Sequence, residues 1–158
     1  MTDAAHPRRI LCVCLGNICR SPMGEGALAR AARDAGIAVE IDSAGTGSWH
    51  VGKPPHPTGL AVAAARGYDN SHQRARTIQP PDFEEFDLIL AMDEQNLATL
   101  RHLQPAGSRA RLALFDPSGR AVPDPYGNPR AAYEATLDQI EAAAAAWIAR
   151  LAGPHPGT

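Results

Sequence analysis

Short apolar runs alternate with helical patterns along this chain, and that alternation restricts the folds open to it. Four runs have the length and composition of buried strands: Ile10–Cys14, Val39–Ser43, Leu88–Ala91 and Leu112–Phe115. Segments with apolar residues three and four apart lie between and after them. This alternation predicts an α/β fold with a mostly parallel sheet. Ligands in such folds bind beyond the carboxyl ends of the strands, which directs attention to the loop after the first strand.

The helical segments carry start and stop signals. Ser21-Pro22 predicts a helix start with the Ser21 hydroxyl as its cap, and Gly36 predicts a left-handed stop after Ala35. Further helices are expected over residues 57–66, as a short turn at residues 83–86, after a capping Asp93 and after Asn128-Pro129. The last helix carries an apolar stripe of Tyr133, Leu137, Ile140, Ala144, Trp147 and Leu151.

Length and composition indicate one globular domain. The 158 residues, 44% of them apolar, suit a single domain over residues 1–158 with an ordered core of about residues 8–152 and frayed ends. The net charge is −2 without a basic block, so no nucleic-acid partner is expected. No apolar run approaches the ~20 residues of a membrane span. Without a signal-peptide pattern we expect a cytoplasmic protein, or one secreted without a signal peptide. The Ala- and Arg-rich composition is typical of a high-GC bacterial genome.

Residues 14–21, CLGNICRS, join the first predicted strand to the first predicted helix. Backbone N–H groups at such a junction converge on an anion, and the helix dipole adds about half a positive charge. Gly16 allows a backbone conformation closed to other residues. Arg20 offers a planar fork of donors to phosphate oxygens. The loop therefore predicts a phosphate site.

Cys14 lies at the floor of this predicted cradle, and the field that attracts phosphate also favours its thiolate form. The same loop would then supply the nucleophile and bind the anion. The three cysteines, Cys12, Cys14 and Cys19, lie within eight positions, which suits reduced thiols better than a disulfide framework. The alternative, a buried cysteine with a surface Arg20, does not explain the surrounding strand, glycine, asparagine and helix start.

A proton donor for a leaving oxygen is offered by Asp124, between Pro123 and Pro125. This segment follows the fourth predicted strand, so it should emerge at the same edge of the sheet as the Cys14 loop. Asp124 is positioned to protonate a leaving group and then to activate water. The alternative is an ordinary Asp-Pro turn.

These two motifs, with four further matches, make the chain resemble the low-molecular-weight protein tyrosine phosphatase family. The matches are Ser43-Ala44-Gly45-Thr46, Trp49-His50-Val51-Gly52, His72-Gln73-Arg74-Ala75-Arg76 and Met92-Asp93-Glu94. The resemblance implies a three-layer α/β/α, phosphatase I-like (Rossmannoid) fold with a four-stranded parallel sheet. It also implies hydrolysis of phosphotyrosine through a phosphocysteine intermediate, with no metal and no cofactor. The implied partners are a phosphotyrosine-containing protein or peptide, and inorganic phosphate or another oxyanion in the loop.

The resemblance assigns a role to each matching residue. Cys14 is implied as nucleophile, Arg20 as the phosphate-gripping residue and Asp124 as acid and base. The walls of an aromatic slot are implied at Trp49 and Tyr126. The phosphate-binding loop comprises Leu15, Gly16, Asn17, Ile18, Cys19 and Ser21, supported by a polar network that includes Ser43 and His72.

The chain departs from the family pattern at several positions, and alternative functions have to be weighed against it. In many members a second aromatic residue follows the position of Tyr126, but this chain has Gly127 there. Position 56 is often an acid in the family, and His56 of this chain is expected on the surface. Cys12 is expected in the core, whereas Cys19 is a candidate to trap oxidised Cys14 as a disulfide. An arsenate reductase of the same fold needs a downstream cysteine pair, and no cysteine follows Cys19. A phosphocysteine carrier or an inactive phosphate-binding module remains as an alternative.

Overall fold

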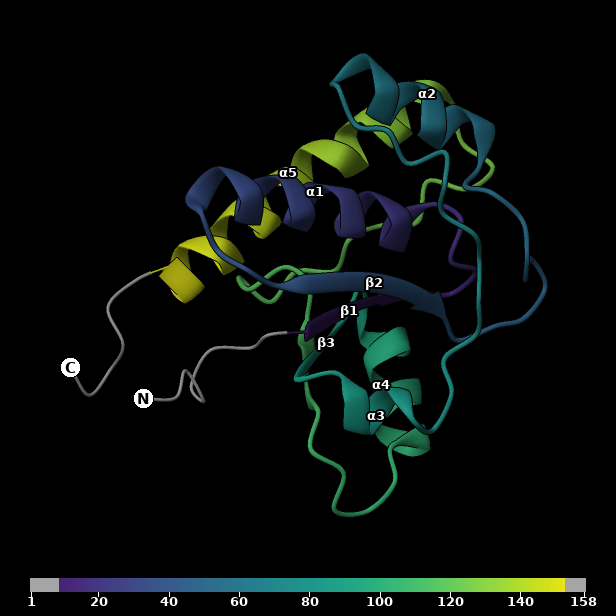
Figure 1. Cartoon of the computed structure of the whole chain (residues 1–158). Coiled ribbons are helices and arrows are strands. Elements are labelled where there is room, and N and C mark those ends of the chain that lie inside the picture. The colour runs from purple at the N-terminus through teal and green to yellow at the C-terminus, as the bar shows by residue number, and fades with distance from the viewer. Residues whose placement is uncertain (1–8, 153–158) are drawn as a thin grey trace.

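Four parallel strands form the centre of the computed structural model, which describes residues 9–152 (Figure 1). They are β1 (Arg9–Cys14), β2 (Glu40–Gly45), β3 (Leu88–Ala91) and β4 (Arg111–Leu114), in the order β2-β1-β3-β4. β1 pairs in parallel with both β2 and β3, and β3 pairs in parallel with β4. The predicted α/β class and parallel sheet are confirmed; the limits of β3 are as predicted, and those of the other strands differ by one or two residues. The frayed ends expected before residue 9 and after residue 152 lie outside the described residues.

Five helices connect or follow the strands within residues 9–152. They are α1 (Arg20–Ala35), α2 (Pro57–Ala65), α3 (Asp82–Glu85), α4 (Glu94–Leu103) and α5 (Arg130–Ala152). The predicted stop of α1 is confirmed, because Gly36 has a φ of 71° and its N–H bonds back to the helix. The predicted cap of α4 is confirmed as well, because Asp93 Oδ1 accepts from Asn96 N at 2.7 Å.

The sheet buries both faces, and alternate residues of β1 serve opposite layers. Ile10 and Cys12 pack with residues of α1, α2 and α5, whereas Leu11 and Val13 pack with residues of α3 and α4. Figure 1 shows the same division, with α1, α2 and α5 above the sheet and α3 and α4 below it. The predicted apolar stripe of α5 is buried as expected, at Tyr133, Leu137, Ile140, Ala144, Trp147 and Leu151. The result is the expected three-layer arrangement.

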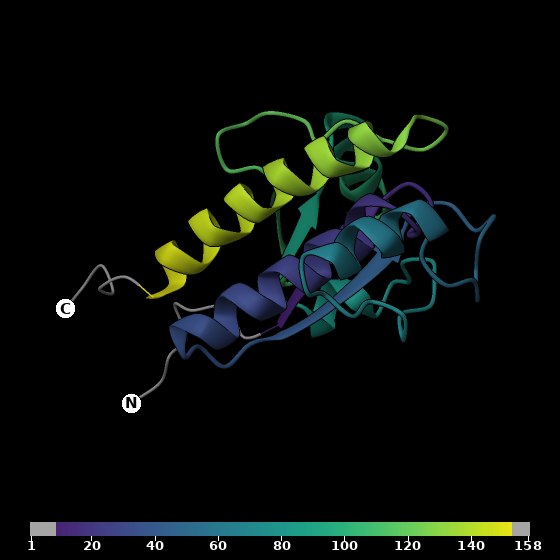
Figure 2. The ribbon, with the colours of Figure 1, turned by 90° about the horizontal axis from the view of Figure 1, so that it is seen from above.

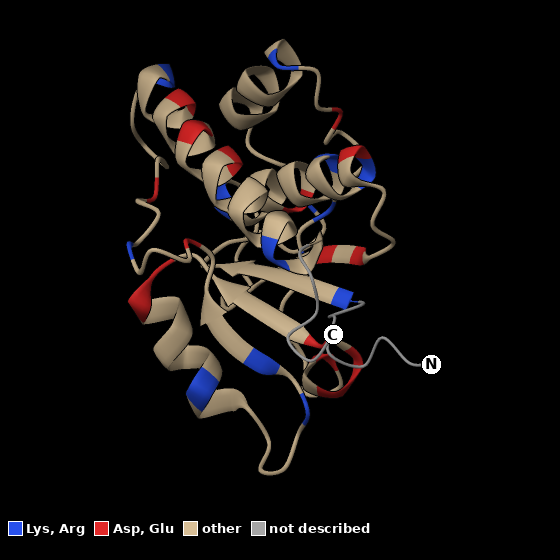
Figure 3. Cartoon of the chain, turned by 90° about the vertical axis from the view of Figure 1, so that its left-hand side faces the viewer, with Lys and Arg blue, Asp and Glu red and all other residues tan. Residues whose placement is uncertain are grey.

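The longest helices set the direction of the upper layer. α1 and α5 run side by side along the sheet (Figure 2). The N-terminus of α1 begins directly beyond the carboxyl end of β1, so that residues 15–19 turn sharply between the two. Charged residues of both signs are interspersed over the elements (Figure 3). The fold thus brings a strand end and a helix start together in a turn of five residues.

Candidate active site

The loop after β1 encloses the sulfur of Cys14, which is 2% exposed. Asn17 N lies 3.3 Å from Cys14 Sγ, and Ser21 Oγ lies 3.0 Å from it. Because Asn17 Nδ2 donates to Ser21 Oγ at 2.8 Å, the hydroxyl proton of Ser21 is left for the sulfur at 3.0 Å or the carbonyl of Ala44 at 3.4 Å, and the sulfur is the nearer acceptor. Two donors therefore face Cys14 Sγ, and donors of this kind stabilise a thiolate.

The expected role of Ser21 as helix cap is wrong. Helix α1 starts one residue earlier, at Arg20, with Cys19 at the N-cap and no side-chain cap bond. Ser21 is consequently the second residue of the helix, and its fully buried hydroxyl turns into the loop rather than toward the helix end. The Ser21 hydroxyl therefore contacts the Cys14 sulfur instead of capping the helix backbone.

The expected reason for Gly16 is also wrong. The left-handed residue of the loop is Asn17, with a φ of 58°, and not the glycine. Gly16 avoids a crowded contact instead, because a Cβ there would lie 3.0 Å from His50 Cδ2 and the ring would have to shift. Asn17 is held in this conformation from both ends of its amide: Nδ2 donates to Ser43 Oγ at 3.0 Å, and Oδ1 accepts from Arg76 N at 2.9 Å. Such side-chain bonds offset the cost of the left-handed conformation.

Arg20 is 3% exposed and anchored at one end of its guanidinium. Its Nη1 donates to Asp93 Oδ2 at 2.7 Å and to the carbonyl of Val122 at 2.9 Å. Its Nε has no hydrogen-bond partner among the described residues. The anchored side therefore fixes the plane of the group, while the Nε–H remains a donor for a bound oxyanion.

Asp124 lies above the loop on the segment between β4 and α5. Its Oδ2 is 3.7 Å from Arg20 Nη2, and its Oδ1 accepts from Tyr126 N at 3.1 Å. The carboxyl group is exposed on its outer side, which leaves it accessible to a leaving oxygen and to water. The structure thus brings Cys14, Arg20 and Asp124 together, as the sequence predicted.

A cavity of about 150 Å³ opens above Cys14. Trp49 is 68% exposed and Tyr126 55% exposed, so both rings stand at its mouth instead of in the core. The other lining residues are Cys14, Leu15, Gly16, Ile18, Cys19, Arg20, His50 and Asp124. The arrangement is a slot with apolar sides and an anion-binding floor.

Cys19 also lines this cavity. Its Sγ contacts Tyr133 Oη at 3.8 Å. Burial raises the pKa of Cys19 to about 12, because it penalises the charged form. Cys19 is therefore a neutral thiol at physiological pH. Cys12 is fully buried and its pKa is raised by the same cause, as befits a core residue.

The supporting network contains Ser43, as expected, and extends to Glu25. Ser43 Oγ accepts from Asn17 Nδ2 of the loop and donates to Glu25 Oε1 at 2.7 Å. His72 is exposed and near enough to Glu25 to lower the pKa of that carboxyl. Glu25 therefore reaches the loop only through Ser43, and support of the loop by His72 stays a prediction.

Three residues of the site were not identified from the sequence. Asp93 was predicted only as a helix cap, yet it also binds Arg20. His50 lines the cavity, and its Nδ1 is buried without a partner among residues 9–152. His56 is not the expected surface feature: it stacks on Tyr133, with ring centroids 5.3 Å apart, and its Nδ1 caps α2. The matched motifs contained Asp93 and His50, but only the folded chain reveals what each one contacts.

The described residues contain neither a cluster of metal-ligating side chains nor a membrane-spanning helix. Among residues 9–152, no group of three or more His, Cys, Asp or Glu side chains is arranged to hold a metal ion. In the same part of the chain, no helix combines the length and apolar character needed to cross a membrane.

The fold and the geometry around Cys14 point to the class of α/β phosphatases. Residues 9–154 match the sequence model described as "Low molecular weight phosphotyrosine protein phosphatase". The chain belongs to this family. The predicted family and its enzyme class, protein-tyrosine phosphatase, are thereby confirmed.

Individual relatives agree with that assignment. A low molecular weight protein-tyrosine-phosphatase of Streptomyces coelicolor is 41% identical over 151 residues, covering 89% of this chain and 92% of the relative. A low molecular weight phosphotyrosine protein phosphatase of Schizosaccharomyces pombe is 43% identical over 126 residues, covering 75% of this chain and 80% of the relative. Among solved structures, Primo-1 superposes with a TM-score of 0.84 at 37% identity, covering 88% of this chain and 95% of its own. Vibrio vulnificus Wzb, solved with benzylphosphonate, superposes with a TM-score of 0.83 at 29% identity, covering 90% and 98%.

Proposed function

We propose that this protein hydrolyses phosphotyrosine in proteins or peptides through a phosphocysteine at Cys14. One observation carries the proposal: the Cys14 sulfur faces two donors at the floor of a cavity whose walls include Arg20 and Asp124. A buried structural cysteine would need neither the donors nor the carboxyl group above it.

In the first step the Cys14 thiolate attacks the phosphorus atom opposite the phenolic oxygen. The S–P bond forms as the P–O bond to tyrosine breaks, and Asp124 gives its proton to the departing oxygen. The Arg20 Nε–H and the backbone N–H groups of the loop bind the non-bridging oxygens, whose charge is greatest in the transition state. Asp124 starts this step protonated and ends it as a carboxylate.

In the second step water attacks the phosphocysteine. Asp124 takes a proton from the water, the new O–P bond forms, and the S–P bond breaks to leave the thiolate. The Ser21 hydroxyl, 3.0 Å from the sulfur, stabilises this leaving group. Inorganic phosphate departs, and both Cys14 and Asp124 return to their starting protonation states.

The preference for an aryl ester follows from the slot. A phenyl ring stacks between the exposed rings of Trp49 and Tyr126 while its phosphate reaches the loop. A serine phosphate has no ring and a shorter side chain, so it cannot fill the slot and reach the floor together. Benzylphosphonate in Vibrio vulnificus Wzb and sulphate in Escherichia coli K30 Wzb support the same mode of oxyanion binding here. Because the reaction needs a reduced thiol, we place it in the cytoplasm.

The test compares two cysteine variants with an aryl phosphate in the presence of a metal chelator. The unaltered protein should release phosphate at the same rate with and without chelator. Cys14→Ser should abolish turnover but still bind vanadate or phosphate, because the loop donors remain. Cys12→Ala is the matched control and should keep its turnover, since Cys12 lies in the core.

Full turnover by Cys14→Ser would contradict the mechanism. A phosphocysteine carrier, the rival from the same chemistry, would form phosphoenzyme from an aryl phosphate but release little inorganic phosphate. Quenching the reaction and measuring both species separates hydrolysis from transfer.

A further inference from the structure

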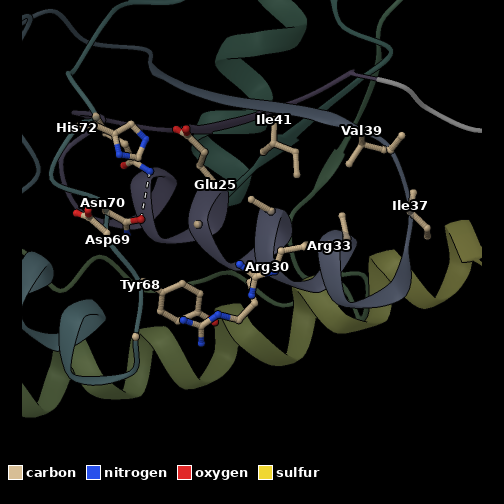
Figure 4. A pocket seen from close by; sticks show the side chains of 16 residues that line it. Glu25, Arg30, Arg33, Ile37, Val39, Ile41, Tyr68, Asp69, Asn70 and His72 are labelled. Atoms are coloured by element: carbon tan, nitrogen blue, oxygen red, sulfur yellow. Dashed lines mark hydrogen bonds between the residues drawn. The ribbon is translucent and has the colours of Figure 1, made fainter.

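Another cavity of the described chain shares no lining residue with the cavity above Cys14 and lies between α1, the start of β2 and the segment after α2. It encloses about 550 Å³ (Figure 4). Figure 4 shows Glu25, Asp69 and His72 toward one end, Arg30 near the middle, and Ile37 and Val39 toward the other end. We propose that this cavity binds a small organic cation with an apolar body, and that Glu25 couples its occupancy to Cys14.

The polar end of the cavity offers mainly acceptors. Glu25 Oε1 is bonded to Ser43, while Oε2 receives no hydrogen bond from residues 9–152. Gln73 is 8% exposed, and its Oε1 has no partner in the described chain. Its Nε2 donates to the carbonyl of Pro22 at 3.3 Å and to Asn70 Oδ1 at 3.4 Å. Because both partners are acceptors, the nitrogen of the amide must face them and the oxygen must point away. Asp69 adds a second carboxylate to the lining.

The two arginine side chains of the lining have partners of their own, whereas His72 is exposed at the same end of the cavity as Glu25. Arg30 Nη1 donates to the carbonyl of Arg66 at 2.8 Å, and its guanidinium lies 3.5 Å from the centroid of the Tyr68 ring. Arg33 pairs with Asp34 at 3.5 Å. Ile37, Val39 and Ile41 supply an apolar wall. Unmatched acceptors beside an apolar wall fit an amine or amidinium on a hydrocarbon or aromatic body.

Glu25 is the residue that such a cation would stabilise most. Burial raises the pKa of Glu25, and the neighbouring Asp42 raises it as well. The bond from Ser43 and the fields of His72 and Arg76 lower it in part. A bound cation offsets the cost of burying the carboxylate, which is the physical source of its affinity.

A continuous chain of hydrogen bonds joins Glu25 to the catalytic sulfur. Ser43 Oγ donates to Glu25 Oε1 at 2.7 Å and accepts from Asn17 Nδ2 at 3.0 Å. The same Nδ2 donates to Ser21 Oγ at 2.8 Å, and Ser21 Oγ lies 3.0 Å from Cys14 Sγ. Asn17 Nδ2 therefore donates to two hydroxyl groups. One is that of Ser43, which bonds to the Glu25 carboxylate, and the other is that of Ser21, which faces the Cys14 sulfur.

This arrangement fixes the sign of the coupling. When a cation neutralises Glu25, Ser43 Oγ becomes a weaker hydrogen-bond acceptor for Asn17 Nδ2. The Asn17 amide can then donate more strongly to Ser21, whose hydroxyl faces Cys14. The field of Glu25, which opposes a thiolate on this strand, also falls; it already raises the pKa of Cys12. Binding in the cavity therefore raises the thiolate fraction of Cys14, and by reciprocity thiolate formation tightens binding.

Benzamidine is the probe, since it joins a planar apolar ring to an amidinium, and benzamide is its neutral counterpart. Calorimetry on the full chain with vanadate in the catalytic loop should detect benzamidine binding, with benzamide at least tenfold weaker. Without vanadate, benzamidine should raise the rate of Cys14 alkylation by iodoacetamide at least twofold on the acid side of its pH profile. Mass spectrometry assigns the alkylated cysteine. Neither measurement depends on turnover, so failure of the proposed function and failure of this proposal are distinguishable.

Two helix variants locate the binding. Ala29 is exposed on α1 and lines the cavity, so Ala29→Arg should fill it and weaken benzamidine binding at least tenfold. Ala35→Arg adds the same charge at an exposed position that does not line the cavity, and it should bind benzamidine as the unaltered chain does. Glu25→Gln should lose both the binding and the benzamidine effect on alkylation. Equal binding of benzamide and benzamidine, equal loss in both arginine variants, or binding without faster alkylation would each overturn the proposal.

Discussion

Arg20 Nη1 lies 2.7 Å from Asp93 Oδ2, and this bond joins the catalytic loop to the start of α4. Asp93 uses its other oxygen to cap that helix, through Asn96 N at 2.7 Å. One carboxylate thus fixes a helix end and the plane of the Arg20 guanidinium, the proposed phosphate-binding group. The two roles can be separated by experiment.

Asp93→Asn should keep the cap and weaken the hold on Arg20, because asparagine caps helices well but carries no charge. We expect kcat/KM for an aryl phosphate to fall about tenfold, since a charge-assisted bond contributes about 1.5–3 kcal/mol. The melting temperature should change little. Asp93→Ala is the comparison: it should lose a similar amount of activity and also about 1 kcal/mol of stability with the cap. Equal melting temperatures in both variants would argue against the dual role.

Asp124→Ala removes the proposed proton donor. The rate should fall by about 10²–10⁴-fold for a phenyl phosphate, whose leaving group is poor, and much less for a nitrophenyl phosphate. A plot of log kcat against leaving-group pKa should become steeper than for the unaltered enzyme. The same loss for both substrates would assign Asp124 to binding instead of proton transfer.

Trp49→Ala removes one exposed wall of the slot. A stacked aromatic pair contributes about 1 kcal/mol beyond burial, so KM for a phosphotyrosine peptide should rise about fivefold. For a short alkyl phosphate, which has no ring to stack, KM should stay within about twofold. The ratio of the two effects is the measurement, and a parallel rise in both would indicate a general disturbance of the loop.

Cys19→Ser tests the predicted protection against oxidation. Hydrogen peroxide oxidises the Cys14 thiolate to a sulfenic acid; the Cys19 thiol then displaces water to form a disulfide. The unaltered protein should recover its activity with dithiothreitol after brief peroxide treatment, whereas Cys19→Ser should lose it irreversibly as Cys14 proceeds to the sulfinic acid. Cys12→Ala should recover like the unaltered protein.

The pH dependence of alkylation provides a further check on Cys19. Because burial raises its pKa to about 12, iodoacetamide at neutral pH should label Cys14 long before Cys19. The sign follows from burial, which disfavours the charged thiolate, so labelling of Cys19 should increase only as the pH approaches 12. Peptide mapping after brief labelling measures the order, and early labelling of Cys19 would contradict the burial argument.

Much of the fold was predictable because its signals are local. The strand of residues 10–14, the glycine stop at Gly36 and the Asp93 cap each depend on a few consecutive residues, and all three are confirmed. The proximity of Cys14 and Asp124 was predictable for a different reason: parallel strands end at one edge of a sheet.

The details that failed depend on contacts between distant segments. A side chain at position 16 would crowd His50, 34 positions later, and Ser21 turns inward because the helix starts at Arg20. Glu25 joins the network because its position on α1 faces Ser43 on β2, a register that periodicity alone does not specify. Sequence patterns fix local geometry, whereas such pairings arise only when the layers pack.

The bond between Arg20 and the carbonyl of Val122 has a consequence for kinetic experiments. Val122 begins the segment that carries Asp124, so the Arg20 guanidinium joins the proposed anion-binding loop to the backbone next to the proposed general acid. A substitution of Arg20 therefore loosens two parts of the machinery together, and the rate it loses exceeds the strength of the phosphate contact alone. Combining Arg20→Lys with Asp124→Ala should give a smaller loss than the product of the two single effects.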